Sequence, residues 1–401
     1  MEEETQTQVV RSKRSLVVFS AVVCSALAVA VGVATLSTTS PAEAAARRRF
    51  ARQTTTTTAK PKAPTTSSSV KPTTATTVKT TAPSPSTSVK APVAPGSTSS
   101  TVPAPKSTSS SNQVLFGAAT EENNSGTLNQ LASFEAHAGK KAALYGMYKS
   151  FYWDPNFPTA EATTVRTHGS IPMITWEPFN PSNGVNQPEY ALSTITAGKY
   201  DTMIRNWANQ IKAFGSPVWL RFAHEMNSDW YPWAEGVNGN APGSYVAAYR
   251  HVHAVFANAG VTNVKWVWNP NVVMDGIGSS LTSLYPGDAY VDMVGIDGYN
   301  WGASTSWGTW QTPASVFGQT MTQVRAITKK GIVIGETSST EAGGNKATWI
   351  KDYFSWMKAN TDIKAFIWFN ISKETDWRIE SSSAAQAAFA SALSDPTFIA
   401  G

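Results

Sequence analysis

Hydrophobic and polar positions follow a repeating pattern along this chain, and the pattern begins at Gln113. From there, short apolar runs such as residues 171–176 are separated by longer amphipathic stretches such as 199–214. The apolar runs lack a clear two-residue alternation, which is typical of parallel strands covered on both faces. The longer stretches have the spacing of helices packed on a core. The pattern therefore predicts strands and helices in strict alternation.

Eight strand–helix pairs are predicted within residues 113–401. We expect strands at residues 114–120, 142–151, 171–179, 217–227, 264–269, 291–299, 331–336 and 363–370. We expect helices at residues 127–138, 159–168, 199–214, 243–259, 280–285, 313–329, 346–360 and 382–393. This count and length match an α/β fold of the (β/α)8 TIM-barrel type, with a doubly wound open sheet as the alternative. We prefer the barrel because polar residues gather at the C-terminal ends of the strands, where barrel active sites lie.

The first 112 residues have a different composition. An N-terminal segment that ends in Arg11, Lys13 and Arg14 is followed by an uncharged apolar run at 16–36 and the small-residue site Ala42-Glu43-Ala44. This layout is typical of an export signal. The run is also long enough for a membrane span. Residues 1–46 are therefore predicted to be a signal peptide or a signal anchor. Either one would make the protein secreted or anchored at the extracellular surface, with a membrane or cell-wall tether left open.

Residues 47–112 consist mainly of Thr, Ser, Pro and Ala and contain one aromatic residue, Phe50. Such a segment cannot bury enough apolar surface to offset its ordering entropy, so we expect a disordered linker. Any chemistry is then expected in a single domain at residues 113–401. That domain is large enough to fold around its own core.

Charge and cysteine content exclude several classes of function. Residues 1–112 carry 13 Lys and Arg against 4 Asp and Glu, whereas the remainder carries 19 against 23. The folded part is therefore acidic and has no electrostatic footprint for nucleic acid. The single cysteine, Cys24, lies in the apolar run, so the domain has no internal disulfide and no thiolate metal site. We expect a monomer without a metal or another cofactor.

Two carboxylates at predicted strand ends point to a reaction. Glu225 ends the fourth strand and Glu336 the seventh, so the two would face each other across the barrel mouth. Arg221 shares a strand face with Glu225, and a buried structural ion pair is the alternative reading of that pattern. Paired carboxyls, one as proton donor and one as nucleophile or base, are what glycosidic cleavage needs.

Aromatic and polar residues surround this pair in the predicted barrel. A sugar-binding groove is predicted from Trp residues on the later strands and loops, namely Trp176, Trp230, Trp233, Trp301, Trp368 and Trp377. Further polar candidates at the strand ends are Glu177, His224, Asp297 and Tyr299. Rival chemistries lack their motifs: Ser228 stands where a zinc H-E-x-x-H needs its second His, and no G-x-S-x-G occurs.

The block Arg221-Phe222-Ala223-His224-Glu225-Met226-Asn227 with Trp230 resembles the signature of glycoside hydrolase family 26. Residues 294–300, 334–336 and 376–378 resemble later blocks of that family in the same order. The resemblance implies a retaining endo-β-glycanase with Glu225 as acid/base and Glu336 as nucleophile. It also implies that His224, Tyr299 and Trp230 line the site around the cleaved bond.

One position departs from the family's mannanases, which carry Trp-His where this chain has Trp176-Glu177. Mixed-linkage glucanases of the family are more similar there. A carboxylate at Glu177 would accept hydrogen bonds from sugar hydroxyls, so both mannan or glucomannan and mixed-linkage β-glucan stay open as substrates. Pairing of Glu177 with a nearby Lys or Arg is the structural alternative. A non-catalytic polysaccharide-binding wall protein on the same barrel is the alternative to an enzyme.

Overall fold

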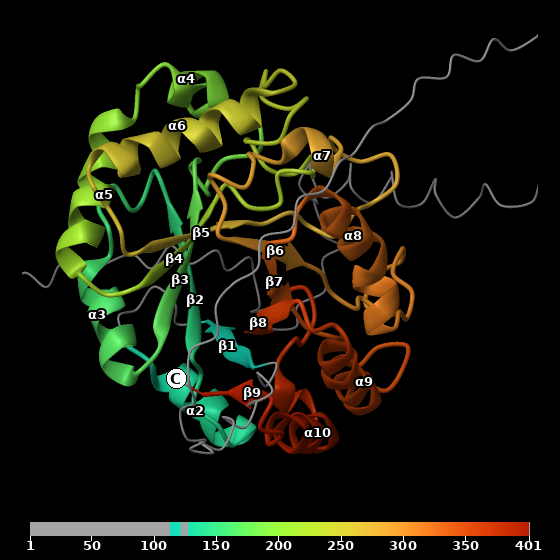
Figure 1. Ribbon diagram of the computed structural model, residues 1–401. Helices are drawn as coiled ribbons and strands as arrows, with labels where there is room; N and C mark the ends of the chain where they lie inside the picture. Colours follow the sequence, from blue (N-terminus) through green and yellow to red (C-terminus); the bar gives the residue numbers. More distant parts are fainter. Residues whose placement is uncertain (1–112, 122–126, 401) are drawn as a thin grey trace, which may run out of the picture. The chain divides into compact units, whose positions relative to one another are not determined.

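The computed structural model describes residues 113–121 and 127–400, which form a (β/α)8 barrel (Figure 1). Its strands are β1 (Val114–Thr120), β2 (Leu144–Ser150), β3 (Ile171–Glu177), β4 (Val218–Phe222), β5 (Val264–Trp268), β6 (Met293–Asp297), β7 (Gly331–Thr337) and β8 (Ile363–Asn370). All neighbours pair in parallel, and β1 pairs with both β2 and β8, so the sheet closes. The predicted barrel is confirmed and the open sheet is excluded. The predicted signal segment and linker lie outside the described residues.

Helices surround the strands as predicted. They are α2 (Asn129–Ala138), α3 (Thr159–His168), α5 (Asp201–Phe214), α6 (Ser244–Asn258), α7 (Leu281–Leu284), α8 (Pro313–Ile327), α9 (Lys346–Ala359) and α10 (Ser383–Leu393). The sequence pattern missed α4 (Leu192–Thr196) and two 3-10 turns at Pro188–Tyr190 and Ile379–Ser381. It also missed a short strand, β9 (Phe398–Ile399), which pairs in parallel with the start of β1. Within the described ranges, no helix is long and apolar enough to cross a membrane.

The hydrophobic core has two layers. The inner layer fills the barrel with side chains that include Met173, Trp219, Val267 and Val333. The larger outer layer lies between the strands and the helices and is rich in aromatic residues. Because side chains alternate along a strand, residues two positions beyond these inner ones also face the interior, and they lie closer to the mouth.

Alternation does not extend to Glu225, because β4 is shorter than predicted. The strand ends at Phe222 rather than Asn227, and both Ala223 (φ 49°) and Glu225 (φ 51°) adopt the left-handed conformation. Non-glycine residues in that region cost about 1–3 kcal/mol each and persist where the surrounding structure imposes them. The Glu225 N–H donates to the Asn269 carbonyl at 2.7 Å, which fixes this turn to the end of β5. Glu225 is therefore aimed by a strained turn.

A bulge on β7 aims Glu336. Ile296 pairs with Ile334, but the next residue, Asp297, pairs with Glu336, so Gly335 is an extra residue on β7. With regular alternation after Val333, Glu336 would face the helices. The bulge turns it to the barrel interior, opposite Asp297, which is how bulges next to active sites re-aim side chains.

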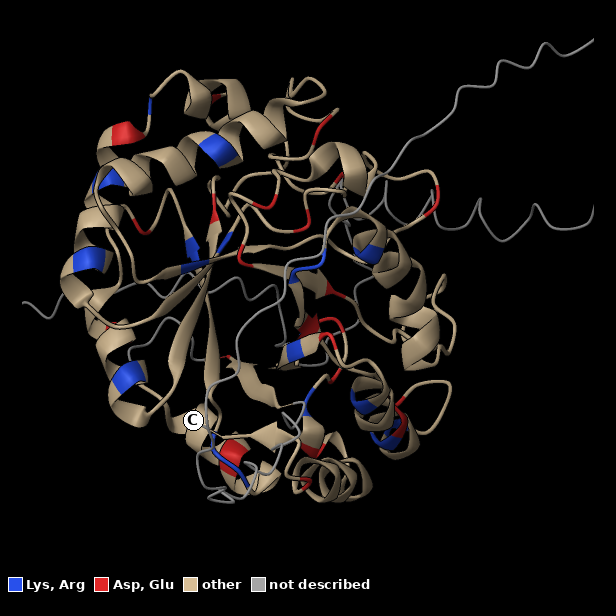
Figure 2. Cartoon of the chain, in the orientation of Figure 1, with Lys and Arg blue, Asp and Glu red and all other residues tan. Residues whose placement is uncertain are grey.

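Charged residues lie both on the outer helices and among the strands. Figure 2 shows Lys and Arg scattered singly over the outer helices, while several acidic and basic positions lie among the strands and the loops that follow them. No stripe of positive charge runs along any helix in this view.

Candidate active site

Arg221 connects the charged residues at the barrel mouth. Its Nη2 donates to Asp297 Oδ2 at 2.6 Å and to Glu336 Oε1 at 2.8 Å, and its Nη1 donates to the Gly335 carbonyl at 3.3 Å. The side chain is 2% exposed, so its charge is screened little by water. One guanidinium thus serves two carboxylates from neighbouring strands. The ion pair considered from the sequence exists, but its partners are Asp297 and Glu336, not Glu225.

Glu336 is held in its ionised form. Oε1 accepts from Arg221, and Oε2 accepts from the Tyr299 hydroxyl at 2.8 Å. Burial alone would raise the pKa of Glu336, but the adjacent Arg221 charge and the hydroxyls of Tyr148 and Tyr299 outweigh it and hold the pKa below the ordinary carboxyl value. A carboxylate that stays ionised while shielded from water is suited to act as a nucleophile.

The pKa of Glu225 is shifted in the opposite direction, above the ordinary carboxyl value. Burial and the negative charge of Glu336 raise the pKa of Glu225 to about 7. Two hydrogen bonds moderate the shift: Trp230 Nε1 donates to Oε2 at 2.9 Å, and Asn271 Nδ2 donates to Oε1 at 2.7 Å. A carboxyl with this pKa keeps its proton at the acidic side of neutrality and can return to the carboxylate form within a catalytic cycle.

His224, next to Glu225, is a neutral imidazole. Burial and the nearby Arg221 charge lower its pKa to about 3. Its ring lies 4.9 Å from that of Tyr231, and its carbonyl accepts from Trp233 Nε1 at 2.6 Å. Nδ1 has no hydrogen-bond partner although it is buried, so an uncommitted polar atom of His224 remains at the site.

Three of these residues also have the spacing of a metal site. Among the described residues, His224, Asp297 and Glu336 offer ligand atoms that lie within 4.8 Å of one another. Arg221 already donates to both carboxylates, and its positive charge would repel a cation at the same place. The arrangement therefore favours a carboxylate pair organised by Arg221 over a metal centre.

Asn269 lies beneath this cluster, in space created by two glycines. A Cβ on Gly295 or Gly335 would overlap the amide oxygen of Asn269, so neither position can carry a side chain without moving it. Asn269 Oδ1 and Asp297 Oδ1 are both buried without a hydrogen-bond partner. Exchanging the oxygen and nitrogen of the Asn269 amide turns a donor toward Asp297, and a hydrogen bond from Asn269 opposes the rise in the pKa of Asp297 that burial causes. Asn269 thus supports the carboxylate that orients Arg221.

Glu177 lies at the mouth, as predicted, but its protonation differs from the expectation. Burial and the charge of Glu336 raise the pKa of Glu177 to about 8, so it carries a proton at neutral pH. It can then donate a hydrogen bond as well as accept one. No Lys or Arg forms an ion pair with Glu177 within the described ranges, but the charges of Arg221 and Lys373 offset part of this rise in its pKa.

Four predicted aromatic residues gather around the carboxylates. The ring of Tyr299 lies 5.0 Å from that of Trp377, and the ring of Trp301 lies 4.9 Å from Trp377. Trp230 reaches Glu225 through its indole nitrogen. Trp377 is almost fully buried, whereas the other three are half-buried and retain surface at the mouth.

Three other predicted tryptophans do not line a groove. Trp176 is completely buried and stacks on Trp207 at 4.3 Å, between β3 and the helices. Trp368 is buried beside Phe389 at 5.0 Å, and Trp233 is also fully buried. The prediction failed because Trp176 alternates with the inward residues of β3, and Trp368 with those of β8, so both point toward the helices.

The loop that carries Trp377 is anchored from below by a buried lysine. Lys346 Nζ donates to the carbonyls of Asp376 at 3.1 Å and Arg378 at 2.7 Å. The Trp377 carbonyl accepts from Ser338 Oγ at 2.5 Å and from Trp368 Nε1 at 3.2 Å. Trp368 therefore holds the site in place from the core instead of contacting substrate.

The sequence analysis missed several residues of the mouth. Tyr148 of β2 faces the interior, where its hydroxyl helps to lower the pKa of Glu336. Phe369 of β8 lies 6.5 Å from Tyr148 and 5.7 Å from Tyr299, ring to ring. Strict alternation from Leu144 or Ile367 would have identified both. Asn271 was also missed, because its bond to Glu225 depends on the conformation of the loop after β5.

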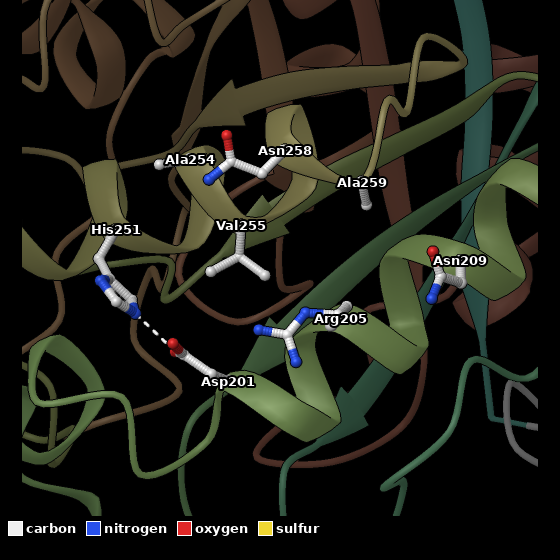
Figure 3. A pocket seen from close by; sticks show the side chains of 8 residues that line it. All are labelled: Asp201, Arg205, Asn209, His251, Ala254, Val255, Asn258 and Ala259. Carbon is white, nitrogen blue, oxygen red and sulfur yellow. Dashed lines mark hydrogen bonds and ion pairs between the residues drawn. The ribbon is translucent and has the colours of Figure 1, made fainter.

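A separate pocket of about 290 Å³ lies on the outer surface, between α5 and α6 (Figure 3). Asp201 and His251 form an ion pair of 2.6 Å across it, and Arg205 and Asn209 line its wall. The pocket contains none of the predicted site residues. The chemistry therefore belongs to the barrel mouth.

Comparisons with known proteins show the family of this chain. The model of "Glycosyl hydrolase family 26" matches residues 152–375, more than half of the chain. "Endoglucanase H" of Acetivibrio thermocellus is 42% identical over 275 residues, which cover 67% of this chain and 29% of that protein. A "Mannan endo-1,4-beta-mannosidase" of Bacillus subtilis is 23% identical over 219 residues, or 47% of this chain and 59% of that protein.

A solved structure of a Bacillus subtilis mannanase has the same fold, with a TM-score of 0.53, 18% identity and coverage of 72% of this chain and 87% of that one. The chain spans less than two thirds of the length of each of these two curated relatives. The family match includes the turn that carries Glu225, the bulge that aims Glu336 and the loops between them. The protein is therefore a glycoside hydrolase that belongs to family 26.

Proposed function

We propose that this protein is a retaining endo-β-glycanase that hydrolyses internal β-glycosidic bonds of a hexose polysaccharide by double displacement. The observation that carries the proposal is the opposite shift of two carboxyls in one site. The pKa of Glu225 is raised to about 7, whereas that of Glu336 lies below its ordinary value. Titratable pairs pushed apart in this way mark an acid and a nucleophile.

Each residue then has a defined step. Glu336 attacks the anomeric carbon while Glu225 gives its proton to the departing glycosidic oxygen, which leaves a glycosyl-enzyme ester. Glu225, now a carboxylate, removes a proton from water as that water displaces Glu336 and restores the starting state. Arg221 and Tyr299 disperse the negative charge of Glu336 before attack and after release. The proton that leaves Glu225 in the first step returns to it in the second.

A non-catalytic polysaccharide-binding protein accounts for the site less well. Binding requires aromatic and hydrogen-bonding surface but no carboxyl that keeps its proton beside another that stays ionised. Keeping Glu336 charged in a buried position takes Arg221 and two hydroxyl groups. A binding module would gain nothing from that arrangement.

For the substrate, we propose a β-linked polymer of glucose or mannose units, with Glu177 as the residue that reads a sugar hydroxyl. These sugars differ in the 2-hydroxyl, so a buried group that donates to one configuration is left unpaired by the other. Relatives named endoglucanase and mannosidase both match, and the chain corresponds to 29% of the former, so its name describes a larger protein. We keep mannan, glucomannan and mixed-linkage β-glucan as candidates.

We also propose that the protein acts outside the cell, as a secreted or surface-anchored enzyme. The support is the sequence of residues 1–46 and the size of the substrate, since a polysaccharide does not cross a membrane unaided. The domain boundaries at 46/47 and 112/113 remain predictions from composition.

The experiment is a substrate screen with the full chain against mannan, glucomannan, barley-type β-glucan, xylan and curdlan. We expect a rapid fall in viscosity with few new reducing ends on at least one hexose polymer, which identifies endo cleavage. Proton NMR of the first products should show the β-anomer. Initial formation of the α-anomer would contradict double displacement, and the Glu336→Gln variant should be inactive on every polymer.

A further inference from the structure

Two neighbouring aromatic side chains at the barrel rim are exposed. Tyr152 is 55% and Trp153 41% exposed, and they are the exposed large hydrophobic residues in the part of the chain that the structure describes. Both follow the C-terminal end of β2, on the same side of the barrel as Glu225 and Glu336. An exposed Trp–Tyr pair beside a site lined with aromatic residues indicates a ligand-binding surface.

The turn that presents them is tightly bonded. The Trp153 N–H donates to Ser150 Oγ at 3.0 Å, and the Asp154 N–H donates to the Ser150 carbonyl at 2.9 Å. The Ser150 N–H in turn donates to Asp154 Oδ2 at 2.9 Å. The Asp154 carbonyl accepts from Trp207 Nε1 at 3.1 Å, which ties the turn to α5. The two rings are therefore held by a rigid base, so little entropy is lost when they bind a ligand.

The same turn is continuous with the candidate active site. Ser150 pairs with Glu177, and the Phe151 N–H donates to the Glu177 carbonyl at 2.9 Å. The Phe151 ring lies 4.7 Å from Trp176 and anchors the turn in the core. Neighbouring strands are about 4.8 Å apart, so β2 lies roughly 10 Å from β4, which leads to Glu225. That separation corresponds to a short stretch of a sugar chain.

We propose that Tyr152 and Trp153 form a distal sugar-binding platform, which receives a pyranose unit of the same β-linked chain some residues away from the cleaved bond. The inference rests on the proposed function and adds a second point of contact to it. The apolar C–H face of a pyranose packs on a flat ring, while its hydroxyls remain available to water and to the Tyr152 hydroxyl. A stable protein partner requires about 800 Å² on each side, far more than two side chains offer.

The test compares full-length variants on oligosaccharides of increasing length and on the polymer. For Trp153→Ala, and to a smaller extent Tyr152→Ala, kcat/KM should fall roughly three- to tenfold on long substrates. It should stay at the parental value on oligosaccharides too short to reach the rim. Trp153→Phe should retain most of the activity because a flat ring remains.

Tyr290→Ala is the matched control, since Tyr290 is a half-buried aromatic residue at the opposite end of the barrel, before β6. It should show no dependence on substrate length. An equal loss on all lengths, or no loss on the polymer, would overturn the platform. A second copy as the occupant would appear as a dimer in sedimentation that Trp153→Ala dissociates, and this result would overturn it as well.

Binding separates this inference from the proposed enzyme activity. Affinity electrophoresis in gels that contain glucomannan or β-glucan should retard Glu336→Gln, and adding Trp153→Ala should weaken the retardation. If the parent binds polysaccharide through Trp153 but cleaves no polymer, the proposed platform is supported and the proposed glycanase activity is refuted. If Trp153→Ala leaves retardation unchanged, the platform fails whatever the activity.

Discussion

Replacement of Tyr299 by Phe tests how the site keeps Glu336 ionised. The change removes one oxygen and keeps the ring, which packs against Phe369 and Trp377. The lost contact is the 2.8 Å hydrogen bond from the Tyr299 hydroxyl to Glu336 Oε2. Because that bond favours the ionised form, its loss must raise the pKa of Glu336.

The magnitude follows from the type of bond. A hydrogen bond to a charged group contributes about 1.5–3 kcal/mol net. One pKa unit corresponds to about 1.4 kcal/mol, so complete loss would shift the pKa by about one to two units. Tyr299 is half-buried, and water can replace part of the interaction. Arg221 remains bound to Oε1, so we expect a shift of about one unit, toward or above the ordinary carboxyl value.

The assay is the pH dependence of kcat/KM, which reports the pKa values of the free enzyme. Activity requires Glu336 ionised and Glu225 protonated, so the parent should show an acid limb below the ordinary carboxyl range and a basic limb near pH 7. In Tyr299→Phe the acid limb should move up by about one unit. The basic limb should move much less, because Tyr299 does not contact Glu225.

Two results would refute this reasoning. An acid limb that stays in place while kcat falls would mean that Tyr299 acts on the substrate and not on the charge of Glu336. A shift of the acid limb to lower pH would mean that the hydroxyl stabilises the protonated form. Trp230→Phe provides the complementary control: it removes a donor to Glu225, so it should raise the basic limb and leave the acid limb unchanged.

Three further predictions concern other parts of the chain. Glu225→Ala should lose about 10²–10⁴-fold in activity on polysaccharide and less on an aryl glycoside with a good leaving group, and parental turnover of polysaccharide would contradict the assignment. Added azide should rescue Glu225→Ala and give a β-azide product, detected by mass spectrometry and NMR, whereas Glu336→Ala should give no β-azide. Glu177→His and Glu177→Gln should change the ratio of kcat/KM among glucomannan, galactomannan and mixed-linkage β-glucan, whereas an unchanged ratio would mean that Glu177 does not read the sugar. A chain that starts at Ser111 should keep parental activity and melt within a few degrees of the full chain by calorimetry, and aggregation would show that the preceding segment packs on the barrel.

The order of elements was predictable because it depends on local pattern. Buried parallel strands are short and continuously apolar, and helices repeat every 3.6 residues, so each element is recognisable without its neighbours. The position of polar residues after the strands then indicated the mouth. Glu225 and Glu336 were found in this way, and the match to family 26 agrees with the motif around Glu225.

The directions of the side chains at the mouth and the protonation of its carboxyls could be read only from the tertiary structure. Alternation placed Glu225 on the inner face of an extended strand, but a turn with positive φ aims it, and the extra residue Gly335 aims Glu336. Trp176 and Trp368 have the composition of sugar platforms and yet face the helices, because their place depends on strand register.

Charge states show the same division. By residue type alone, Glu177, Glu225 and Glu336 are equivalent carboxyls, and only the family resemblance assigned different roles to Glu225 and Glu336. In the folded chain, burial and mutual repulsion raise the pKa of the first two, while Arg221 keeps the third ionised. Sequence determined the order of the strands and which polar segments follow them, since that depends on local pattern alone. Only the tertiary structure decided which carboxyl carries a proton, because that depends on burial and on charges brought together from different strands.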